Sequence, residues 1–247
     1  MRSLLRRSVI ALLGVLATLV LALPASAQVK IQSRPQLDVS FSISSLGFGI
    51  QAAKPLPHRS DIRGGFNFYN YNADLTDDGI DYAGEVGLKS VNIQFDKYLV
   101  AGLFVSGGAL VWNGNKVDST ALVPGGQAFS LGGTSYFSDP SSPVHGDSAI
   151  TFKKFAPLLS LGYGNLTSKG HIAYAIEAGV AFHGTPAATL IMTGSACAPS
   201  AVGPFCQNVA TTPAIQTNVA AQQAKINDDI SDFKYYPILQ FTIGYKF

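Results

Sequence analysis

Residues 233–247 of the chain have the sequence FKYYPILQFTIGYKF. Starting at Phe233, every second residue is apolar or aromatic, and the intervening positions include Lys234, Gln240 and Lys246. Because successive side chains of a β-strand point to opposite faces, this alternation predicts a strand with one apolar face and one more polar face. Aromatic residues near both ends of the apolar face are typical of a strand that crosses an outer membrane.

Similar alternation recurs in segments upstream. It is clearest in residues 46–52, 155–163 and 172–182, which approach the ~10 residues that a tilted membrane strand requires. In residues 99–112 both faces are apolar or small, so we predict a strand there without assigning its faces. Only helices and closed barrels satisfy every backbone group in lipid, and no apolar run after residue 28 is long enough for a membrane helix.

Residues 81–95 alternate less regularly. Tyr82 and Val86 occupy even positions, whereas the apolar residues from Val91 onward occupy odd ones. Such a one-residue phase change predicts a β-bulge near residues 89–91. Two shorter strands that have been merged would give the same pattern.

Turn-forming and polar segments divide the alternating parts into strands. Short turns are predicted at residues 54–60, 96–98 and 165–170, and longer polar segments at residues 73–79, 115–148 and 184–232. Membrane barrels alternate short periplasmic turns with longer outer loops in this way. With a short strand at residues 37–43, the sequence predicts an all-β fold: an antiparallel transmembrane β-barrel of about eight strands with both termini in the periplasm. A soluble β-sandwich is the competing fold.

The first 27 residues have the features of a signal peptide. Arg2, Arg6 and Arg7 form a basic region, residues 9–23 are apolar, and an Ala-Ser-Ala cleavage pattern ends at residue 27. An uncleaved membrane helix is the alternative, but the apolar run is shorter than the ~20 residues a span needs. We therefore predict a signal peptide over residues 1–27, a barrel domain over residues 28–247 and export to the outer membrane.

Charge and cysteine usage restrict the partners. Cleavage would leave 14 basic against 15 acidic side chains, so the basic balance of the full chain is no argument for a nucleic-acid partner. Cys197 and Cys206 lie in one irregular segment. In an exported protein they favour a single loop-closing disulfide, and two thiols without a nearby histidine offer too few ligands for a metal site.

One helix is predicted, at residues 212–232. Thr212 is a suitable N-cap and Pro213 a suitable first helical residue. Apolar residues recur at helical spacing, namely Ile215, Val219, Ile226 and Ile230. We expect a lid packed over the barrel mouth in preference to a helix that binds a partner.

The strand that ends the chain resembles the C-terminal signature of bacterial outer-membrane proteins, which the barrel-assembly machinery recognises. Tyr235, Phe241, Tyr245 and Phe247 match the aromatic positions of that signature. The chain resembles small barrels of the OmpA/OmpW-like class, and within it an uncharacterised subgroup. The matching segments are residues 232–237, 63–67, 113–115 and 155–157. The resemblance implies a barrel that contacts outer-membrane lipid and the assembly machinery, and it brings no known activity.

Catalytic motifs are missing from the sequence: it contains no Gly-x-Ser-x-Gly, His-Glu-x-x-His or phosphate-loop pattern. His145 and His183 fall near the predicted outer side, and a triad with Ser148, Asp147 or Glu177 can be drawn on paper. Triads are recognised by geometry, which spacing does not supply. We therefore predict that the protein is not an enzyme, with no catalytic residues, no cofactor and no metal.

Seven charged residues fall on the polar positions of their predicted strands and are assigned to the lumen: Arg63, Glu85, Lys89, Lys154, Glu177, Lys234 and Lys246. A selectivity lining for a pore is one interpretation. Ion pairs that fill the interior are favoured, because an eight-stranded barrel is just wide enough for side chains. Four aspartates in residues 74–81 could hold Ca²⁺ through oxygen ligands, but a solvated acidic turn is the preferred interpretation.

Three functions remain open. The first is a monomeric structural or surface-interaction barrel with long outer loops, one of them braced by the disulfide. The second is a porin-like channel or transporter for small solutes or a hydrophobic compound. The third and least favoured is a lipid-modifying enzyme of the outer membrane.

Cell fractionation tests the predicted fold and location. We expect the chain in the outer-membrane pellet, as a band whose electrophoretic mobility changes on heating because a folded barrel resists detergent until it is boiled. Release of the chain into the soluble periplasm would contradict the barrel and favour the β-sandwich.

Overall fold

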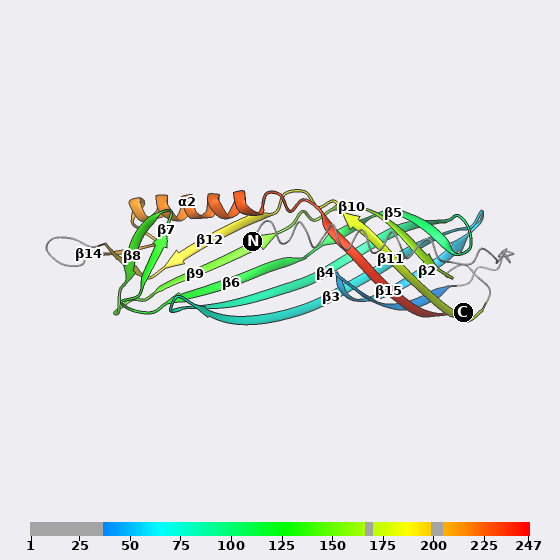
Figure 1. Ribbon diagram of the computed structural model, residues 1–247, viewed down its shortest axis with the longest axis horizontal. Coiled ribbons are helices and arrows are strands. Elements are labelled where there is room, and N and C mark those ends of the chain that lie inside the picture. Colours follow the sequence, from blue (N-terminus) through cyan, green and yellow to red (C-terminus); the bar gives the residue numbers. More distant parts are fainter. Residues whose placement is uncertain (1–36, 166–169, 199–204) are drawn as a thin grey trace. The chain divides into compact units, whose positions relative to one another are not determined.

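The computed structural model describes residues 37–165, 170–198 and 205–247 (Figure 1). These residues belong to one compact unit, Ile31–Phe247. The predicted signal peptide, residues 1–27, lies outside the described residues. Among the residues that are described, no helix is both long and apolar enough to cross a membrane.

Eight antiparallel strands close into a ring. Each pairs with the next in the order β4, β3, β2, β1, β15, β11, β10, β5, and β5 pairs back to β4. Their bounds are β1 Asp38–Ser44, β2 Gly47–Leu56, β3 Ser60–Asp77, β4 Ile80–Tyr98, β5 Leu103–Asn113, β10 Ala156–Gly164, β11 Ile172–Ala181 and β15 Tyr236–Lys246. These strands correspond to the eight segments predicted from alternation, and their closure confirms an antiparallel barrel.

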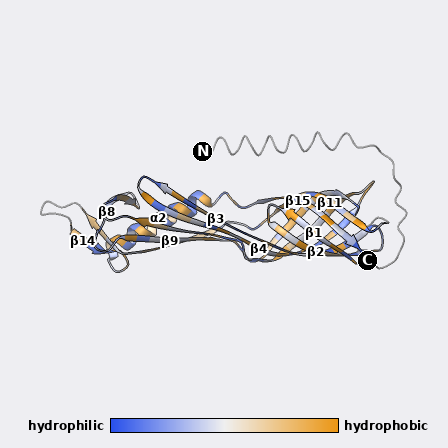
Figure 2. Cartoon of the chain, turned by 90° about the horizontal axis from the view of Figure 1, so that it is seen from below, coloured by the Kyte–Doolittle hydropathy of each residue, from blue (hydrophilic) through white to orange (hydrophobic). Residues whose placement is uncertain are grey.

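Hydrophobic and more polar residues alternate along the ring strands, as the colours of Figure 2 show, and most of the large apolar side chains of these strands are exposed. On β15, Leu239, Phe241 and Ile243 are exposed, while Gln240 and Thr242 between them are buried. An apolar outer belt around a polar interior reverses the arrangement of a soluble protein, and it suits lipid outside the ring.

The total number of strands is larger than the eight predicted, because the described residues contain fifteen. The additional strands are β6 Lys116–Val123, β7 Ala128–Leu131, β8 Thr134–Ser138, β9 Val144–Thr151, β12 Ala187–Thr193, β13 Ser195–Ala198 and β14 Phe205–Asn208. They lie in the segments predicted as long polar loops. They are only four to eight residues long and do not alternate regularly, so alternation did not reveal them.

The distal halves of β3 and β4 run past the ring and carry most of these strands. β6 pairs with β4, β9 with β6, and β12 with β9, which gives the order β12-β9-β6-β4-β3. We call these five paired segments the outer sheet. Because β3 and β4 belong to both the ring and the outer sheet, the two share continuous backbone.

The irregular alternation of β4 reflects a change of surroundings. Its pairing with β3 is unbroken from Asp77↔Ile80 to Ser60↔Lys97. In the ring, the inward even-numbered residues are polar, as at Ser90, and the outward odd-numbered ones are apolar, as at Val91. In the outer sheet the same inward parity carries Tyr82 and Val86. The prediction of a bulge on β4 is therefore corrected.

A register shift does occur next to the predicted position, but its extra residue is on β5. Val91 pairs with Trp112 and Asn92 pairs with Leu110, so Val111 has no partner on β4. The bulge bends β5 where the ring gives way to the outer sheet.

The outer sheet has an apolar core of its own. Its buried members are Val123, Leu131, Tyr136, Val144, Met192, Ala196, Val209, Ile215 and Val219. A second, four-stranded sheet in the order β14-β13-β8-β7 supplies part of this core. The outer strands and the single described helix therefore form a folded outer domain in place of irregular loops.

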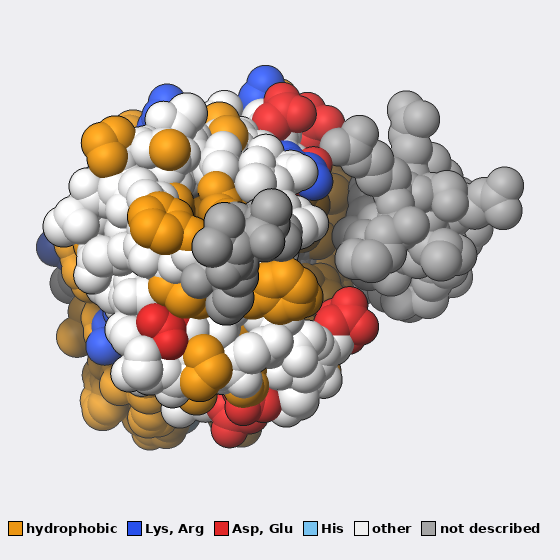
Figure 3. Space-filling model, turned by 90° about the vertical axis from the view of Figure 1, so that its left-hand side faces the viewer, with side chains coloured by type: hydrophobic (Ala, Val, Ile, Leu, Met, Phe, Trp, Pro, Cys, Tyr) orange, Lys and Arg blue, Asp and Glu red, His pale blue; other side chains and the backbone are white. Residues whose placement is uncertain are grey.

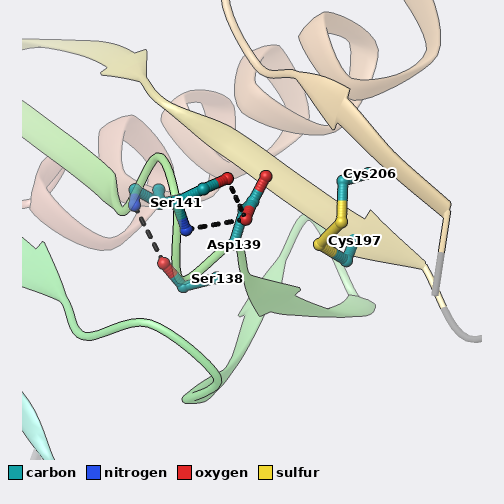
Figure 4. The surroundings of a disulfide bond; sticks show 6 residues. Ser138, Asp139, Ser141, Cys197 and Cys206 are labelled. Carbon is teal, nitrogen blue, oxygen red and sulfur yellow. Dashed lines mark hydrogen bonds between the residues drawn. A yellow bond between two sulfur atoms is a disulfide. The ribbon is translucent and has the colours of Figure 1, made fainter.

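The predicted disulfide is present between Cys197 and Cys206, which face each other across β13 and β14 (Figure 4). Asp139 lies nearby and accepts hydrogen bonds from Ser141, 2.7 Å from Oγ and 2.9 Å from the backbone N–H. These bonds lower the pKa of the Asp139 carboxyl. Ser138 joins two further segments, because its Oγ accepts a bond from Val144 N–H and donates to the Val123 carbonyl.

The helix predicted at residues 212–232 is observed as α2, Pro213–Ile230. Thr212 is the N-cap residue with extended backbone, although its side chain makes no capping bond, and Ile215 and Val219 are buried. The helix packs against β12 and β7 (Figure 1). The helix therefore lies along the outer sheet. The prediction of a lid over the barrel mouth is corrected.

Two amide side chains of α2 pair with the edge strand β12. Asn227 Oδ1 accepts a hydrogen bond from Ala188 N–H at 2.8 Å, and Gln223 Oε1 accepts one from Leu190 N–H at 2.9 Å. The two residues are four apart, so one face of the helix meets alternate N–H groups of the strand. An open strand edge is a template for aggregation, and α2 covers this one.

The double variant Gln223→Leu, Asn227→Leu tests this edge contact. Both substitutions keep the side-chain size but leave two strand N–H groups without acceptors, which costs about 1–3 kcal/mol each. We expect faster hydrogen exchange at Ala188 and Leu190, with the amides of the barrel strands unchanged. Lys225→Leu on the exposed face of α2 is the control, and equal exchange in both variants would contradict the role of these amides.

Candidate functional site

The inward faces of the ring strands form a buried polar interior. They carry serine, threonine, asparagine and glutamine side chains together with charged ones, a consequence of polar alternation around a closed ring. The buried polar residues of the ring include Ser42, Gln51, Arg63, Asn67, Ser90, Asn92, Gln94, Asp96, Ser106, Ser160, Glu177, Gln240 and Thr242. This interior is the candidate functional site, because it decides whether the barrel can pass a solute.

Arg63 of β3 is the centre of the interior. Its Nε lies 2.9 Å from Asp96 Oδ2 of β4, and its Nη1 lies 2.7 Å from Glu177 Oε2 of β11. All three side chains are at most 3% exposed. Two carboxylates on opposite sides of one guanidinium match the planar fork of donors that arginine presents.

Neutral side chains complete the coordination of these charges. Arg63 also donates to Gln51 Oε1 and Ser106 Oγ, each at 3.4 Å. Gln94 Nε2 donates to Glu177 Oε1 at 2.9 Å, Ser160 donates to the same oxygen, and Ser106 donates to Asp96. The network joins side chains from β2, β3, β4, β5, β10 and β11, so it spans the interior.

Apolar clusters lie at both ends of this network. At the strand ends next to the outer domain, the cluster consists of Leu46, Leu110, Ala156, Leu158, Ala181 and Ile238. At the strand ends next to the short turns, it consists of Tyr98, Phe104, Ala173 and Ala175. The interior is therefore filled by a central ionic layer between two apolar clusters, and the buried charged groups Asp38, Asp61 and Lys246 accompany the cluster next to the short turns. This agrees with the packed lumen expected of an eight-stranded ring.

Phe104 shows how tightly the lower layer is packed. Its side chain is fully buried and its ring lies 5.9 Å below the guanidinium carbon of Arg63. A Cβ added to Gly162 would lie 2.2 Å from that ring. Glycine on β10 is thus required by the close approach of Phe104.

Of the seven charges assigned to the lumen from the sequence, three are buried in the ring: Arg63, Glu177 and Lys246. Lys246 faces Asp38 across the β1–β15 pair, and Asp38 is also buried. Asp96 was not among the predicted lumen charges because residues 96–98 were predicted as a turn, but β4 extends to Tyr98 and Asp96 continues its even-numbered polar set from Ser90. That parity was the signal that could have revealed it.

The other four charges are exposed: Glu85, Lys89, Lys154 and Lys234. Glu85 and Lys89 share the odd, outward parity of Val91 on β4. Lys154 and Lys234 precede the first residues of β10 and β15. Their assignment to the lumen is corrected, because alternation gives the face of a strand but not where the ring begins.

The histidines of the sketched triad are not brought together with their partners. His145 is exposed on β9, where Asp147 shares its face and Ser148 has the opposite parity. His183 is buried against Phe152, with ring centroids 4.9 Å apart, and burial lowers its pKa. Glu177 is occupied by Arg63, Gln94 and Ser160.

The acidic segment at residues 74–81 forms a tight hairpin. β3 ends at Asp77, β4 starts at Ile80, and the two residues between them, Asp78 and Gly79, have φ angles of 49° and 75°. An Asp-Gly pair with positive φ is the preferred two-residue turn of a twisted hairpin. Among the described residues, one group of potential metal ligands converges, namely Asp139 with the disulfide-bonded Cys197 and Cys206.

A cavity of about 380 Å³ lies on the outer sheet above this hairpin's arms. It is lined by residues of β3, β4, β6 and β9, among them Asp74, Asp81, Leu122, His145 and Asp147. Thr76 Oγ1 donates to Asp81 at 2.8 Å within it. The four aspartates spread along both arms and the turn of the hairpin, an arrangement that fits the solvated acidic turn.

The four residues of the predicted assembly signal are exposed on the outward face at or next to β15: Tyr235, Phe241, Tyr245 and Phe247. The Tyr245 and Phe247 rings meet edge to face with centroids 5.1 Å apart. Their recognition by the assembly machinery stays a prediction.

The closed antiparallel ring, its apolar belt and its filled polar interior define the class of outer-membrane β-barrel proteins. Two solved structures from Acinetobacter baumannii share the fold. CarO is 18% identical with a TM-score of 0.53, over 88% of this chain and 100% of that one. CarO2 is 16% identical with a TM-score of 0.54, over 87% of this chain and 100% of that one. No family model matches the chain, and no curated protein sequence matches it.

Arg63→Met tests the central network. The substitution leaves Asp96 and Glu177 buried without their counter-charge, which costs about 3–5 kcal/mol. We expect a clearly lower urea midpoint for loss of the folded, heat-modifiable band. The triple variant Arg63→Met, Asp96→Asn, Glu177→Gln removes all three charges and should recover much of the loss. Lys54→Met, at an exposed position of β2, is the control, and an equal midpoint for Lys54→Met and Arg63→Met would refute the role of the network.

Proposed function

We propose that this protein is a closed outer-membrane barrel whose role is structural: it anchors a folded outer domain and presents it at the cell surface for interaction. The observation that carries the proposal is the network around Arg63. Side chains from five ring strands meet there through bonds of 2.7 to 3.4 Å, and Ser160 of a sixth strand donates to Glu177. A solute could pass only if these buried charges separated, and separating them in a low-dielectric interior is costly.

The outer domain supports a presenting role. It has its own apolar core, a disulfide, and a helix that covers the edge strand. Each of these features reduces the freedom of the distal segments, and rigid surfaces lose less entropy when a partner binds. The face seen in Figure 3 combines uncharged polar surface with apolar patches and acidic groups, and basic side chains lie around its margin.

A channel or transporter for small solutes is the second candidate. The observation in its favour is that the central layer is ionic. Stability alone does not require this, because apolar side chains of similar volume could fill a barrel at least as stably. Polar groups of this kind could exchange partners with a passing solute. This route requires the barrel to open in response to a stimulus.

Conductance in planar lipid bilayers separates the two candidates. We expect the refolded mature chain to give no stable conductance steps, because the ionic layer and both apolar layers fill the interior. As a positive comparison, Arg63→Ala combined with Asp96→Ala and Glu177→Ala should empty the central layer and admit ions, provided that this variant still gives a heat-modifiable band. Stable conductance steps in the parent would reject the closed barrel and favour the transporter.

A further inference from the structure

Four exposed lysines lie where the ring meets the outer domain: Lys89, Lys153, Lys154 and Lys234. We call them the rim lysines. Three of them, Lys89, Lys154 and Lys234, were assigned to the lumen from the sequence. The proposed closed barrel gives them no function. Their exposure leaves the ammonium groups free to reach whatever surrounds the rim.

Backbone hydrogen bonds place the rim lysines at neighbouring positions around the ring. The carbonyl of Lys89 accepts from Gly114 N–H at 2.8 Å, and the carbonyl of Lys154 accepts from Asn113 N–H at 2.8 Å. On the other side, the carbonyl of Lys234 accepts from Gly184 N–H at 3.2 Å. The rim lysines thus form a belt across β4, β5, β10, β11 and β15.

Exposed aromatic residues accompany the belt. Trp112, Phe155, Phe182 and Tyr235 each lie within two residues of one of these hydrogen-bonded positions and are 39–61% exposed. Phe182 and Tyr235 meet edge to face with ring centroids 5.6 Å apart. Aromatic girdles mark the level of the lipid headgroups on membrane barrels. The rim lysines therefore sit at headgroup level on the outer side.

Charge sign changes with distance from the ring. On each of four segments a lysine lies nearest the ring and acidic residues lie farther out, and on α2 Lys225 is a further cation beyond them. The sets are Lys89 before Glu85 and Asp81 on β4, Lys116 before Asp118 on β6, Lys153 and Lys154 before Asp147 towards β9, and Lys234 before Asp232, Asp229 and Asp228 towards α2. The segments run in both chain directions, so the order follows position and not the sequence direction.

We infer that the rim lysines bind the phosphate groups of the outer-leaflet lipid. An ammonium on a flexible stem suits a phosphate as a point charge, and surface lysines near an anionic leaflet attract it additively. Lipid phosphates would repel carboxylates at the same level. The acidic residues nearest to Lys89 and Lys234 along the chain, Glu85 and Asp232, lie farther from the ring. Lys116 is not counted, because it is paired with Asp118.

Binding of lipid A to the folded mature chain in neutral detergent tests the inference, with EDTA present to remove bridging cations. The probes are lipid A with both phosphates and its dephosphorylated form, measured by native mass spectrometry. The triple variant Lys89→Gln, Lys154→Gln, Lys234→Gln should weaken binding of the phosphorylated form on the order of a hundredfold, roughly fivefold per lysine. Added salt should weaken binding by the parent.

The matched control removes three cations from the opposite, short-turn end: Lys54→Gln, Arg59→Gln, Lys97→Gln. It should bind phosphorylated lipid A like the parent, and replacing Lys89, Lys154 and Lys234 with arginine should preserve binding. Equal weakening in the rim and control variants, or equal affinity of the parent for the dephosphorylated form, would overturn the inference. A heat-modifiable band verifies folding of each variant, and bilayer conductance reports separately on the closed barrel.

Discussion

A buried guanidinium held between two buried carboxylates is the interaction on which the rest of the barrel depends. Arg63 cannot lose its proton, so it is stable inside the ring only while Asp96 and Glu177 face it. That requirement fixes the relative positions of β3, β4 and β11. The neutral side chains of Gln51, Gln94, Ser106 and Ser160 then satisfy the remaining donors and acceptors, and the interior is left filled.

β4 belongs to both the ring and the outer sheet, and the polarity of its inward face differs between the two. Along β4 the inward face is polar in the ring and apolar in the outer sheet, without any break in its pairing with β3. Ser90 and Val86 therefore share a face although their polarity differs. The change of solvent, and not a change of backbone, sets the pattern. The pattern changes near Lys89, where aromatic and basic residues gather.

The outer sheet is open, whereas the ring is closed. A closed ring has no free edge, but the outer sheet ends at β12, whose N–H groups would otherwise be open to another chain. Side-chain amides of α2 pair with them, and the disulfide joins the two strands of the distal hairpin. Fixing these segments makes the domain a defined surface instead of a set of loops.

The sequence by itself determined the ring, the disulfide and the helix. Lipid on one face forces strict alternation, which made the ring strands recognisable from residues such as those of 233–247. It could not determine the outer strands, because strands wetted by water tolerate polar residues on their exposed face and alternate weakly. Nor could parity separate Glu177, which is in the lumen, from Lys154 and Lys234, which lie just before ring strands. Only ring closure decided that, because it brings Arg63, Asp96 and Glu177 together from distant strands and defines where the inside ends.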